Sequence, residues 1–295
     1  MLHILTLVAA PGGLDATHLA SVRAALAGIG ATPGTPDWLS EAEAVDLPFG
    51  EAPAELAAAA ARAALGAAKV DAIAQPAQGR RKRLLVADMD STIVTSETLD
   101  ELAAYAGLKD AVAAITKRSM NGELDFAQAL QERVGMLRGL EVSALDATWA
   151  RTEIMPGAAT LVATMRAHGA VCCLASGGFT FFTGRVAEIL GFNHHVSNIL
   201  LIEDGKLAGK VAEPVFDRNA KLATLTRLAA EGGLPMAATL AVGDGANDLD
   251  MIGAAGLGVA YHAKPIVAAA ARARVDHNDL LALLFAQGYR RAEFR

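Results

Sequence analysis

Two acidic clusters carry the residue types best suited to chemistry in this sequence. Asp88 and Asp90 directly follow one short apolar run, and Asp244 and Asp248 follow another, on a glycine-rich turn. Carboxylates this close repel one another unless a cation or a shared proton stabilises them. Their oxygens suit Mg²⁺, which takes a few protein ligands and keeps water or phosphate oxygens. Each cluster alone is also typical of a capped turn, but two in one sheet favour a functional site.

Two further elements could bind a phosphoryl group. Ser176 and Gly177, followed by Gly178, supply a hydroxyl and consecutive backbone N–H groups at a predicted strand-to-helix turn, where phosphate oxygens can bind. Lys221 lies near the start of an amphipathic helical pattern. Alone, the first pattern is typical of an ordinary turn and the second of a solvated surface lysine.

A parallel sheet must position these residues. Short apolar runs at residues 84–87, 171–175, 239–242 and 257–260 are separated by helical patterns, which is typical of buried strands in an α/β, doubly wound, Rossmann-like sheet. Ligands of such sheets bind beyond the carboxyl ends of the strands. The acidic clusters and Ser176 stand at those ends, so the sequence predicts one shared site there.

Two departures from simple alternation predict additions to the sheet. Residues 99–149 have a helical pattern throughout, which is too long for one crossover and predicts a helical cap inserted after the first strand. Asp204 and Gly205, between residues 199–202 and 206–211, predict a β-hairpin.

The chain divides into two predicted domains. Residues 1–75 predict a small α+β unit, residues 76–83 a linker, and residues 84–295 the sheet domain with its cap at about 97–153. Prolines interrupt the middle of the small unit, which is expected to hold one or two short strands. Its other expected elements are a strand at 3–8, a helix at 15–29 that begins near Asp15 or Thr17, a helix at 55–65 and a strand at 69–74.

Composition excludes several classes of protein. With 295 residues, 53% of them hydrophobic, the chain can bury a sizeable core, and its net charge of −6 argues against nucleic-acid binding. The basic run at 80–83 is expected to be a solvated linker. Cys172 and Cys173 are adjacent in an apolar run and predict two small buried residues and a reducing compartment. Since no apolar stretch predicts a membrane span or a signal peptide, we expect a cytoplasmic protein.

In chain order, these elements resemble the four motifs of the haloacid dehalogenase superfamily of phosphohydrolases, from residue 84 to about 279. The motifs are Asp88-x-Asp90-x-Thr92, Ser176-Gly177-Gly178, Lys221 and Gly243-Asp244-Gly245-Ala246-Asn247-Asp248. The resemblance implies a Mg²⁺-dependent phosphoric monoester hydrolase in which Asp88 is the nucleophile that forms an aspartyl-phosphate. Asp90 would be the general acid and then the general base.

The same resemblance implies the remaining roles at the sheet. The Asp88 carboxylate, the Asp90 backbone carbonyl and Asp244 would bind Mg²⁺, and Asp248 would support the metal through a water molecule or through Lys221. The phosphoryl oxygens would be held by Ser176, the Gly177 N–H group and Lys221.

The predicted cap supplies groups that could select a substrate. Arg133 shares a helical face with Phe126, where either a snorkelling arginine or a carboxylate clamp would fit. Together with Glu97, Met120 and the motifs above, these residues resemble the phosphoserine phosphatase family. That resemblance implies that Glu97 binds the ammonium of L-phosphoserine and Arg133 its carboxylate. Phe126 would help close the pocket, Met120 would line it, and Asn247 would help place the substrate or its phosphate. The residues that carry the resemblance are Met120-Asn121-Gly122, Asp125-Phe126, Asn219-Ala220-Lys221 and those quoted above.

Hydrolysis of L-phosphoserine to L-serine and phosphate, the last step of serine biosynthesis, is therefore the expected activity. A phosphotransferase that passes the phosphate to another alcohol, or a phosphatase for another small molecule, is the alternative on the same scaffold. A third alternative is an amino-acid-binding regulator with a vestigial phosphatase domain. Residues 1–75 resemble the small ACT-like βαββαβ domains fused to bacterial phosphoserine phosphatases, and a packing or dimerisation role is expected for them, so a homodimer stays open.

Overall fold

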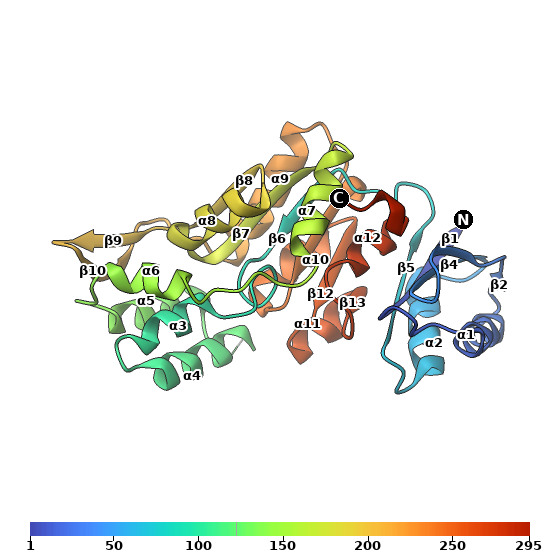
Figure 1. The fold of residues 1–295 in the computed structure, drawn as a ribbon, viewed down its shortest axis with the longest axis horizontal. Coiled ribbons are helices and arrows are strands. Elements are labelled where there is room, and N and C mark those ends of the chain that lie inside the picture. The colour runs from blue at the N-terminus through green and yellow to red at the C-terminus, as the bar shows by residue number, and fades with distance from the viewer. Residues whose placement is uncertain (122) are drawn as a thin grey trace.

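The computed structural model describes residues 1–121 and 123–295, except for the side chain of Met120. A small N-terminal unit packs against one end of a larger α/β unit, which carries the helical cap at its other end (Figure 1). None of the described helices is long and apolar enough to cross a lipid bilayer.

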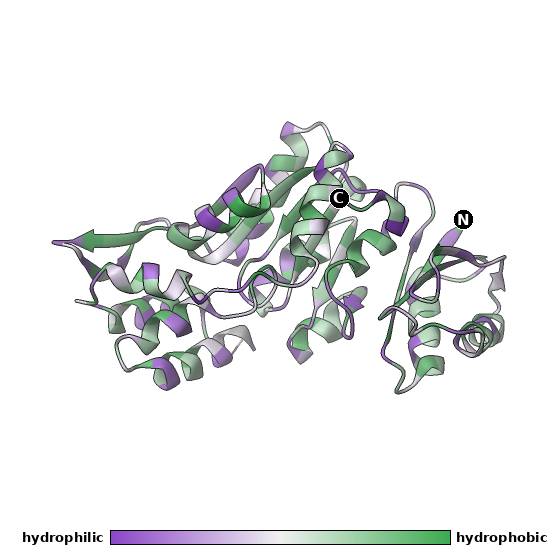
Figure 2. Cartoon of the chain, viewed as in Figure 1, coloured by the Kyte–Doolittle hydropathy of each residue, from purple (hydrophilic) through white to green (hydrophobic). Residues whose placement is uncertain are grey.

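The larger unit is built on a six-stranded parallel sheet in the order β13-β12-β11-β6-β7-β8. The four apolar runs that predicted strands form its centre, whose ribbon is hydrophobic in Figure 2. The edge strands β8 and β13 were not predicted, because β8 is largely exposed and polar and β13 is only three residues long. The strands are β6 (Leu84–Ala87), β7 (Val171–Phe179), β8 (His194–Asn198), β11 (Thr239–Gly243), β12 (Leu257–Tyr261) and β13 (Ala273–Val275).

Helices cover both faces of this sheet, which makes it doubly wound as predicted. Successive residues of β6 alternate between the two hydrophobic clusters: Leu85 joins the cluster under α7 and α12, and Leu84 the cluster under α9 and α10. The covering helices are α7 (Ala158–Ala167), α8 (Thr180–Leu190), α9 (Arg218–Glu231), α10 (Leu249–Ala254), α11 (Pro265–Ala270) and α12 (Ala282–Ala286). Three short 3₁₀ turns lie at Met236–Ala238, Ala246–Asp248 and Arg291–Glu293.

The predicted cap follows β6, and the predicted hairpin follows β8. The cap returns to the sheet beside its own entry point, because Val94 and Ile154 form an antiparallel bridge. The cap also bridges to the hairpin through Glu141 and Lys206. Its helices are α3 (Thr98–Ala104), α4 (Lys109–Met120), α5 (Phe126–Met136) and α6 (Ser143–Trp149), and the hairpin consists of β9 (Leu200–Glu203) and β10 (Lys206–Val211).

The N-terminal unit has the βαββαβ arrangement of an ACT-like domain with one extra short strand. Its antiparallel sheet has the order β2-β4-β1-β5, with β3 also paired to β4, and Asp15 caps α1. The proline-broken middle holds more strand than predicted, since Pro48 lies within the seven-residue β4. The elements are β1 (His3–Ala9), α1 (Ala16–Gly28), β2 (Thr32–Pro33), β3 (Asp37–Ser40), β4 (Ala44–Gly50), α2 (Ala54–Leu65) and β5 (Val70–Pro76).

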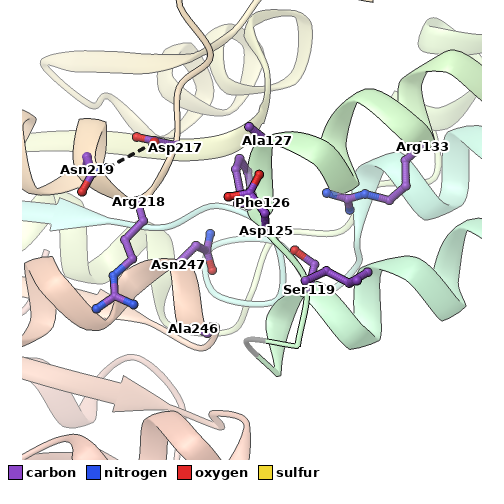
Figure 3. Close-up of a pocket in the computed structure, with 11 residues that line it drawn as sticks. Ser119, Asp125, Phe126, Ala127, Arg133, Asp217, Arg218, Asn219, Ala246 and Asn247 are labelled. Atoms are coloured by element: carbon purple, nitrogen blue, oxygen red, sulfur yellow. Dashed lines mark hydrogen bonds between the residues drawn. The ribbon is translucent and has the colours of Figure 1, made fainter.

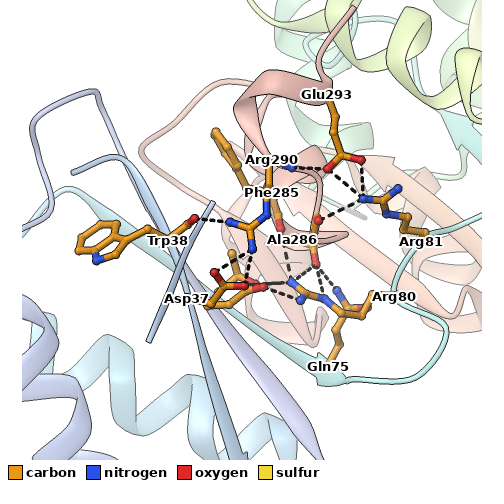
Figure 4. Close-up of polar contacts among 12 residues, drawn as sticks. Asp37, Trp38, Gln75, Arg80, Arg81, Phe285, Ala286, Arg290 and Glu293 are labelled. Atoms are coloured by element: carbon orange, nitrogen blue, oxygen red, sulfur yellow. Dashed lines mark hydrogen bonds and ion pairs between the residues drawn. The ribbon is translucent and has the colours of Figure 1, made fainter. Parts of the chain in front are cut away.

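Polar contacts join the two units (Figure 4). Arg80 forms an ion pair with Asp46 at 2.5 Å and also donates to the Ala286 carbonyl at 3.0 Å, to which Gln75 donates at 2.7 Å. The predicted solvation of the basic run is therefore wrong for Arg80. It is also wrong for Lys82, whose ammonium donates to two carbonyl oxygens and whose pKa burial lowers to about 8. Charge neutralisation and carbonyl acceptors, which sequence does not reveal, make burial tolerable.

The two cysteines are free and buried, as predicted. Burial raises the pKa of both thiols to about 12, so folding favours the protonated form. The stability that they contribute is complete below the unfolded pKa of about 8.5 and is lost as pH rises toward 12. At pH 8 we expect both thiols to react with a disulfide reagent such as DTNB only after addition of guanidinium. Rapid reaction of the folded protein would contradict this burial.

Candidate active site

Neighbouring strand ends bring the predicted residues together. Because β6 lies between β11 and β7, Asp88, Asp244 and Ser176 emerge at the same edge of the sheet. The register is direct, with Ala87 opposite both Val242 and Leu174. All of these polar side chains are nearly inaccessible to solvent, which concentrates charge in a region of low dielectric.

Lys221 lies at the centre of this cluster. Its Nζ atom is 2.7 Å from Oδ1 of Asp88 and 2.7 Å from Oδ1 of Asp248, and all three side chains are buried. Burial by itself would lower the lysine pKa, but the two carboxylates raise it, so the ammonium stays charged. Burial raises the pKa of Asp248 to about 7, and Asp88 adds to the rise while Lys221 opposes it. The lysine is thus the counterion that makes two buried carboxylates tolerable.

Asp244 differs from its neighbours because its carboxylate has no donor. Both oxygens are buried, and neither accepts a hydrogen bond from any residue that the structure describes. Lys264 Nζ lies 3.4 Å from Oδ2, beyond hydrogen-bond distance for a strong pair. Oxygen atoms of Asp88, Asp244 and Asp248 lie within 4.8 Å of one another. An all-oxygen cluster with an unsatisfied buried carboxylate fits a hard divalent cation.

The oxygens of Asp248 already have protein partners. One accepts from Lys221, and the other accepts the Gly245 N–H at 3.1 Å. Asp88 has one oxygen near Lys221 and the N–H of Met89. The carboxylate of Asp244 and the second oxygen of Asp88 are therefore the most available ligands for a cation. Asp248 is less available, because both of its oxygens already accept hydrogen bonds.

Asp90 is held where a proton donor could act. Its Oδ1 atom accepts the Thr98 N–H at 3.0 Å. Burial raises the pKa of Asp90 well above its ordinary value, and the nearby Glu97 and Asp88 raise it further. A raised pKa favours the protonated form of this carboxyl group, which can then pass its proton to a departing oxygen.

The last residues of β7, from Ser176 to Gly178, present backbone and hydroxyl groups to the same space. Ser176 Oγ accepts the Gly178 N–H at 2.9 Å, and Asn198 donates to the Gly177 carbonyl at 2.9 Å, which fixes this segment. A Cβ atom at Gly177 would lie 2.6 Å from Cζ of Phe126. A larger residue here would force the Phe126 ring to move, so the cap packs closely against the end of β7.

The cap closes a small cavity of about 30 Å³ over these groups. Within it, Glu97 and Arg133 face Asp88 from the cap side, and Ser91 Oγ donates to Glu97 at 2.6 Å. Its lining residues are Asp88, Asp90, Glu97, Leu99, Phe126, Arg133, Ser176, Gly177, Gly178 and Asn247. The pocket role expected for Met120 concerns a side chain outside the described part of the chain.

A second cavity of about 280 Å³ adjoins the first, because Phe126, Arg133 and Asn247 line both (Figure 3). Asn247 Oδ1 is buried and accepts from no described residue, so it is free for a ligand. The figure shows Arg133 reaching from α5 toward this space, opposite Asn247 at the sheet. The small cavity therefore has an adjoining approach from the side of Arg218 and Asn219.

Sequence reasoning missed two residues that touch this constellation. Ser91 holds Glu97, and Lys264 lies beside Asp244 and donates its backbone N–H to the Asp244 carbonyl at 3.0 Å. Lys264 could have been found, because it follows β12 at the same edge of the sheet and precedes a proline that begins a helix. Ser91 carries no comparable signal, since serine is common in any turn.

Comparison with protein families places residues 82–256 in the haloacid dehalogenase-like hydrolases. A phosphoserine phosphatase of Streptomyces coelicolor is 43% identical over 241 residues, which cover 82% of this chain and 58% of that protein. The chain spans between 52% and 64% of the length of four curated relatives that it matches.

Solved structures agree with this assignment. A probable phosphoserine phosphatase of Vibrio cholerae, in unliganded form, matches 99% of this chain and 88% of its own, with 33% identity and a TM-score of 0.78. A phosphoserine phosphatase with a phospho-aspartyl intermediate analogue matches 69% of this chain and 98% of its own, with 38% identity and a TM-score of 0.67. This chain therefore belongs to the phosphoserine phosphatase family of haloacid dehalogenase-like hydrolases.

Proposed function

We propose that this chain hydrolyses L-phosphoserine to L-serine and phosphate through an aspartyl-phosphate on Asp88. The observation that carries the proposal is the small cavity in which Asp88 meets Glu97 and Arg133. One wall offers a nucleophile with phosphate-binding groups, and the other offers one anionic and one cationic side chain. Phosphoserine has the complementary set of a phosphate, an ammonium and a carboxylate.

In the first step, a carboxylate oxygen of Asp88 attacks phosphorus and the bond from phosphorus to the serine oxygen breaks. Asp90 protonates that oxygen as it leaves, since its raised pKa keeps the proton available. In the second step a water attacks the phosphorus of the aspartyl-phosphate, gives its proton to Asp90, and frees Asp88 and inorganic phosphate. Splitting the displacement in this way replaces one difficult step with two easier ones.

Mg²⁺ is the cation that we assign to the acidic cluster, because all its candidate ligands are oxygens. Asp88, Asp244 and the backbone carbonyl of Asp90 would hold it, and Asp248 would support the site through Lys221. When bound, it offsets negative charge on the phosphoryl group and on the nucleophile.

Lys221, Ser176 and the Gly177 N–H group would hold the phosphoryl oxygens. These donors are fixed before substrate arrives. Two carboxylates bind Lys221, and Asn198 holds the end of β7 through its hydrogen bond to the Gly177 carbonyl. Preorganised donors lower the barrier to phosphoryl transfer more than mobile ones can.

The cap would bind the ammonium and carboxylate groups of the substrate. Glu97 would bind the ammonium, Arg133 the carboxylate, and Phe126 and Asn247 would complete the enclosure. Leu99 adds an apolar surface to the same cavity. A pocket that excludes water would strengthen the pair between Glu97 and the ammonium and the pair between Arg133 and the carboxylate.

Initial-rate phosphate release from a panel of phosphate esters in the presence of Mg²⁺ tests this assignment. We expect L-phosphoserine to have the highest kcat/KM. Much faster turnover of phosphoglycolate or sugar phosphates would show that another substrate is the natural one. Added alcohols, with product analysis, would reveal transfer to an acceptor other than water.

Replacing Arg133 with alanine tests the carboxylate clamp. We expect KM for phosphoserine to rise by about 10²-fold, while O-phosphoethanolamine, which lacks the carboxylate, is affected far less. Steady-state kinetics on both substrates measure the difference, and Arg151→Ala, an exposed arginine after α6, is the matched control. Equal losses on both substrates would make Arg133 structural.

For the rest of the chain, we propose that residues 1–75 are a packing module for the phosphatase unit, beyond the linker at 76–83. The support is a polar network between the two units: Arg290 binds Asp37 at 2.8 Å (Figure 4), and Arg80 binds Asp46. We assign the enzyme to the cytoplasm and to the last step of serine formation, in keeping with its two free thiols.

A further inference from the structure

Arg133 is a buried cation that no described carboxylate contacts directly. Its residue is 6% exposed, and burial lowers its pKa, although Asp100, Glu97 and Asp90 are near enough to raise it in part. A buried charge is more favourable when a partner of opposite charge also binds it directly. Its Nε donates to the Ala129 carbonyl at 3.1 Å and its Nη1 to Thr116 Oγ1 at 2.9 Å, whereas Nη2 donates to no described residue. The guanidinium is thus fixed on one side and open on the other, toward the cavities that it lines.

Thr116 is the residue that fixes it. Its hydroxyl proton has two acceptors within reach, Asp100 Oδ1 at 2.6 Å and the Val112 carbonyl at 3.1 Å. The shorter contact to a carboxylate is the stronger hydrogen bond. With the proton on the Asp100 side, a lone pair of Oγ1 remains to accept from Arg133.

The three side chains form a relay across three cap helices. Asp100 comes from α3, Thr116 from α4 and Arg133 from α5, and all are buried. Each link depends on the one before it: the carboxylate orients the hydroxyl, and the hydroxyl orients the guanidinium. An arginine side chain without such a partner has several rotamers available, and few of them would point Nη2 into the cavity.

We propose that Thr116 and Asp100 are positioning residues that hold Arg133 ready for the substrate carboxylate, and so set the preference for an amino-acid phosphate ester. The proposal rests on the function proposed above and extends its specificity beyond the groups that touch the substrate. Neither residue contacts the reacting atoms, so their effect falls on substrate binding.

Kinetics of Thr116→Val with two substrates test it. We expect KM for L-phosphoserine to rise roughly tenfold, with kcat nearly unchanged, because one hydrogen bond to a charged group is lost. The preference for phosphoserine over O-phosphoethanolamine falls by the same factor. Thr116→Ser, which keeps the hydroxyl, restores KM, and Asp100→Asn raises it by a smaller factor.

Two comparisons separate positioning from general damage to the cap. Thr148→Val is the matched control, since Thr148 is equally buried in a cap helix but its hydroxyl donates to the Ala144 carbonyl. It should leave both KM values as they are. In an Arg133→Ala background, Thr116→Val should change KM for phosphoserine no further.

Equal losses on both substrates, or an additive effect in the Arg133→Ala background, would overturn the proposal. Should Thr116→Val unfold, as judged by its Tm, Asp100→Asn carries the same test. A wild-type enzyme that does not prefer phosphoserine would instead refute the substrate assignment, which distinguishes the two failures.

Discussion

Asp88→Asn is expected to lower kcat for phosphoserine by at least ~10⁴-fold while the protein stays folded. The amide is too weak a nucleophile to attack phosphorus, and no described side chain replaces it at the end of β6. The fold should tolerate the change, because the carbonyl oxygen of the new amide can still accept from Met89 and Lys221, which now contact Asp88. Removing this charge also relieves repulsion, since Asp88 raises the pKa of Asp90, of Asp244 and of Asp248. The Tm of the variant should therefore equal or exceed that of the wild type.

Acid quenching with phosphoserine labelled on its phosphate distinguishes loss of the nucleophile from indirect damage. The wild-type protein should carry acid-stable, alkali-labile label, and the Asp88→Asn protein none. Asp204→Asn is the control, because Asp204 occupies an exposed hairpin turn at φ 50°, a conformation that asparagine also adopts. Substantial turnover by Asp88→Asn would rule out the covalent route.

The centre of the fold was predictable because its strands are buried on both faces. Such strands read as short apolar runs, and the polar turn after each one marks the edge of the sheet where ligands bind. Strand β4 and the edge strands β8 and β13 lack that signal: β4 contains a proline, and β8 exposes its histidines. Their pairing depends on neighbours that are distant in sequence, which local pattern does not specify.

The candidate site was predictable to the extent that its residues stand in motifs. Asp88 and Asp244 directly follow strands and Ser176 lies near the end of β7, so the topology of the sheet brings them together. Thr116 and Asp100 could not be found in this way, because each looks like an ordinary helix residue until three cap helices are packed together. The prediction that Arg80 is solvated was wrong for a related reason. The counterion that allows its burial, Asp46, lies in the other unit and is distant in sequence.

Lys221→Met should be the most destabilising single substitution in the active site. Removing the ammonium leaves the buried carboxylates of Asp88 and Asp248 without the counterion that lies 2.7 Å from each. Breaking a buried ion pair by removing one partner costs about 3–5 kcal/mol. We therefore expect urea unfolding to show a loss of that order, with an unchanged m-value. Activity should fall as well, because the phosphoryl oxygens lose a fixed cation.

Two further variants show whether Lys221→Met loses stability because buried carboxylates are left without a counterion. Lys210→Met, at an exposed position on β10, should change the free energy of unfolding by less than about 0.5 kcal/mol. The double variant Lys221→Met/Asp248→Asn lacks one of the two unpaired buried carboxylates. Part of the free energy of unfolding should therefore be recovered, even though more of the site has been removed. If the double variant is as unstable as the sum of the single ones, Lys221 stabilises the core by packing its stem and not by neutralising Asp88 and Asp248. Recovery in the double variant would instead tie the stability of the fold to the same charge balance that prepares Asp88 for attack.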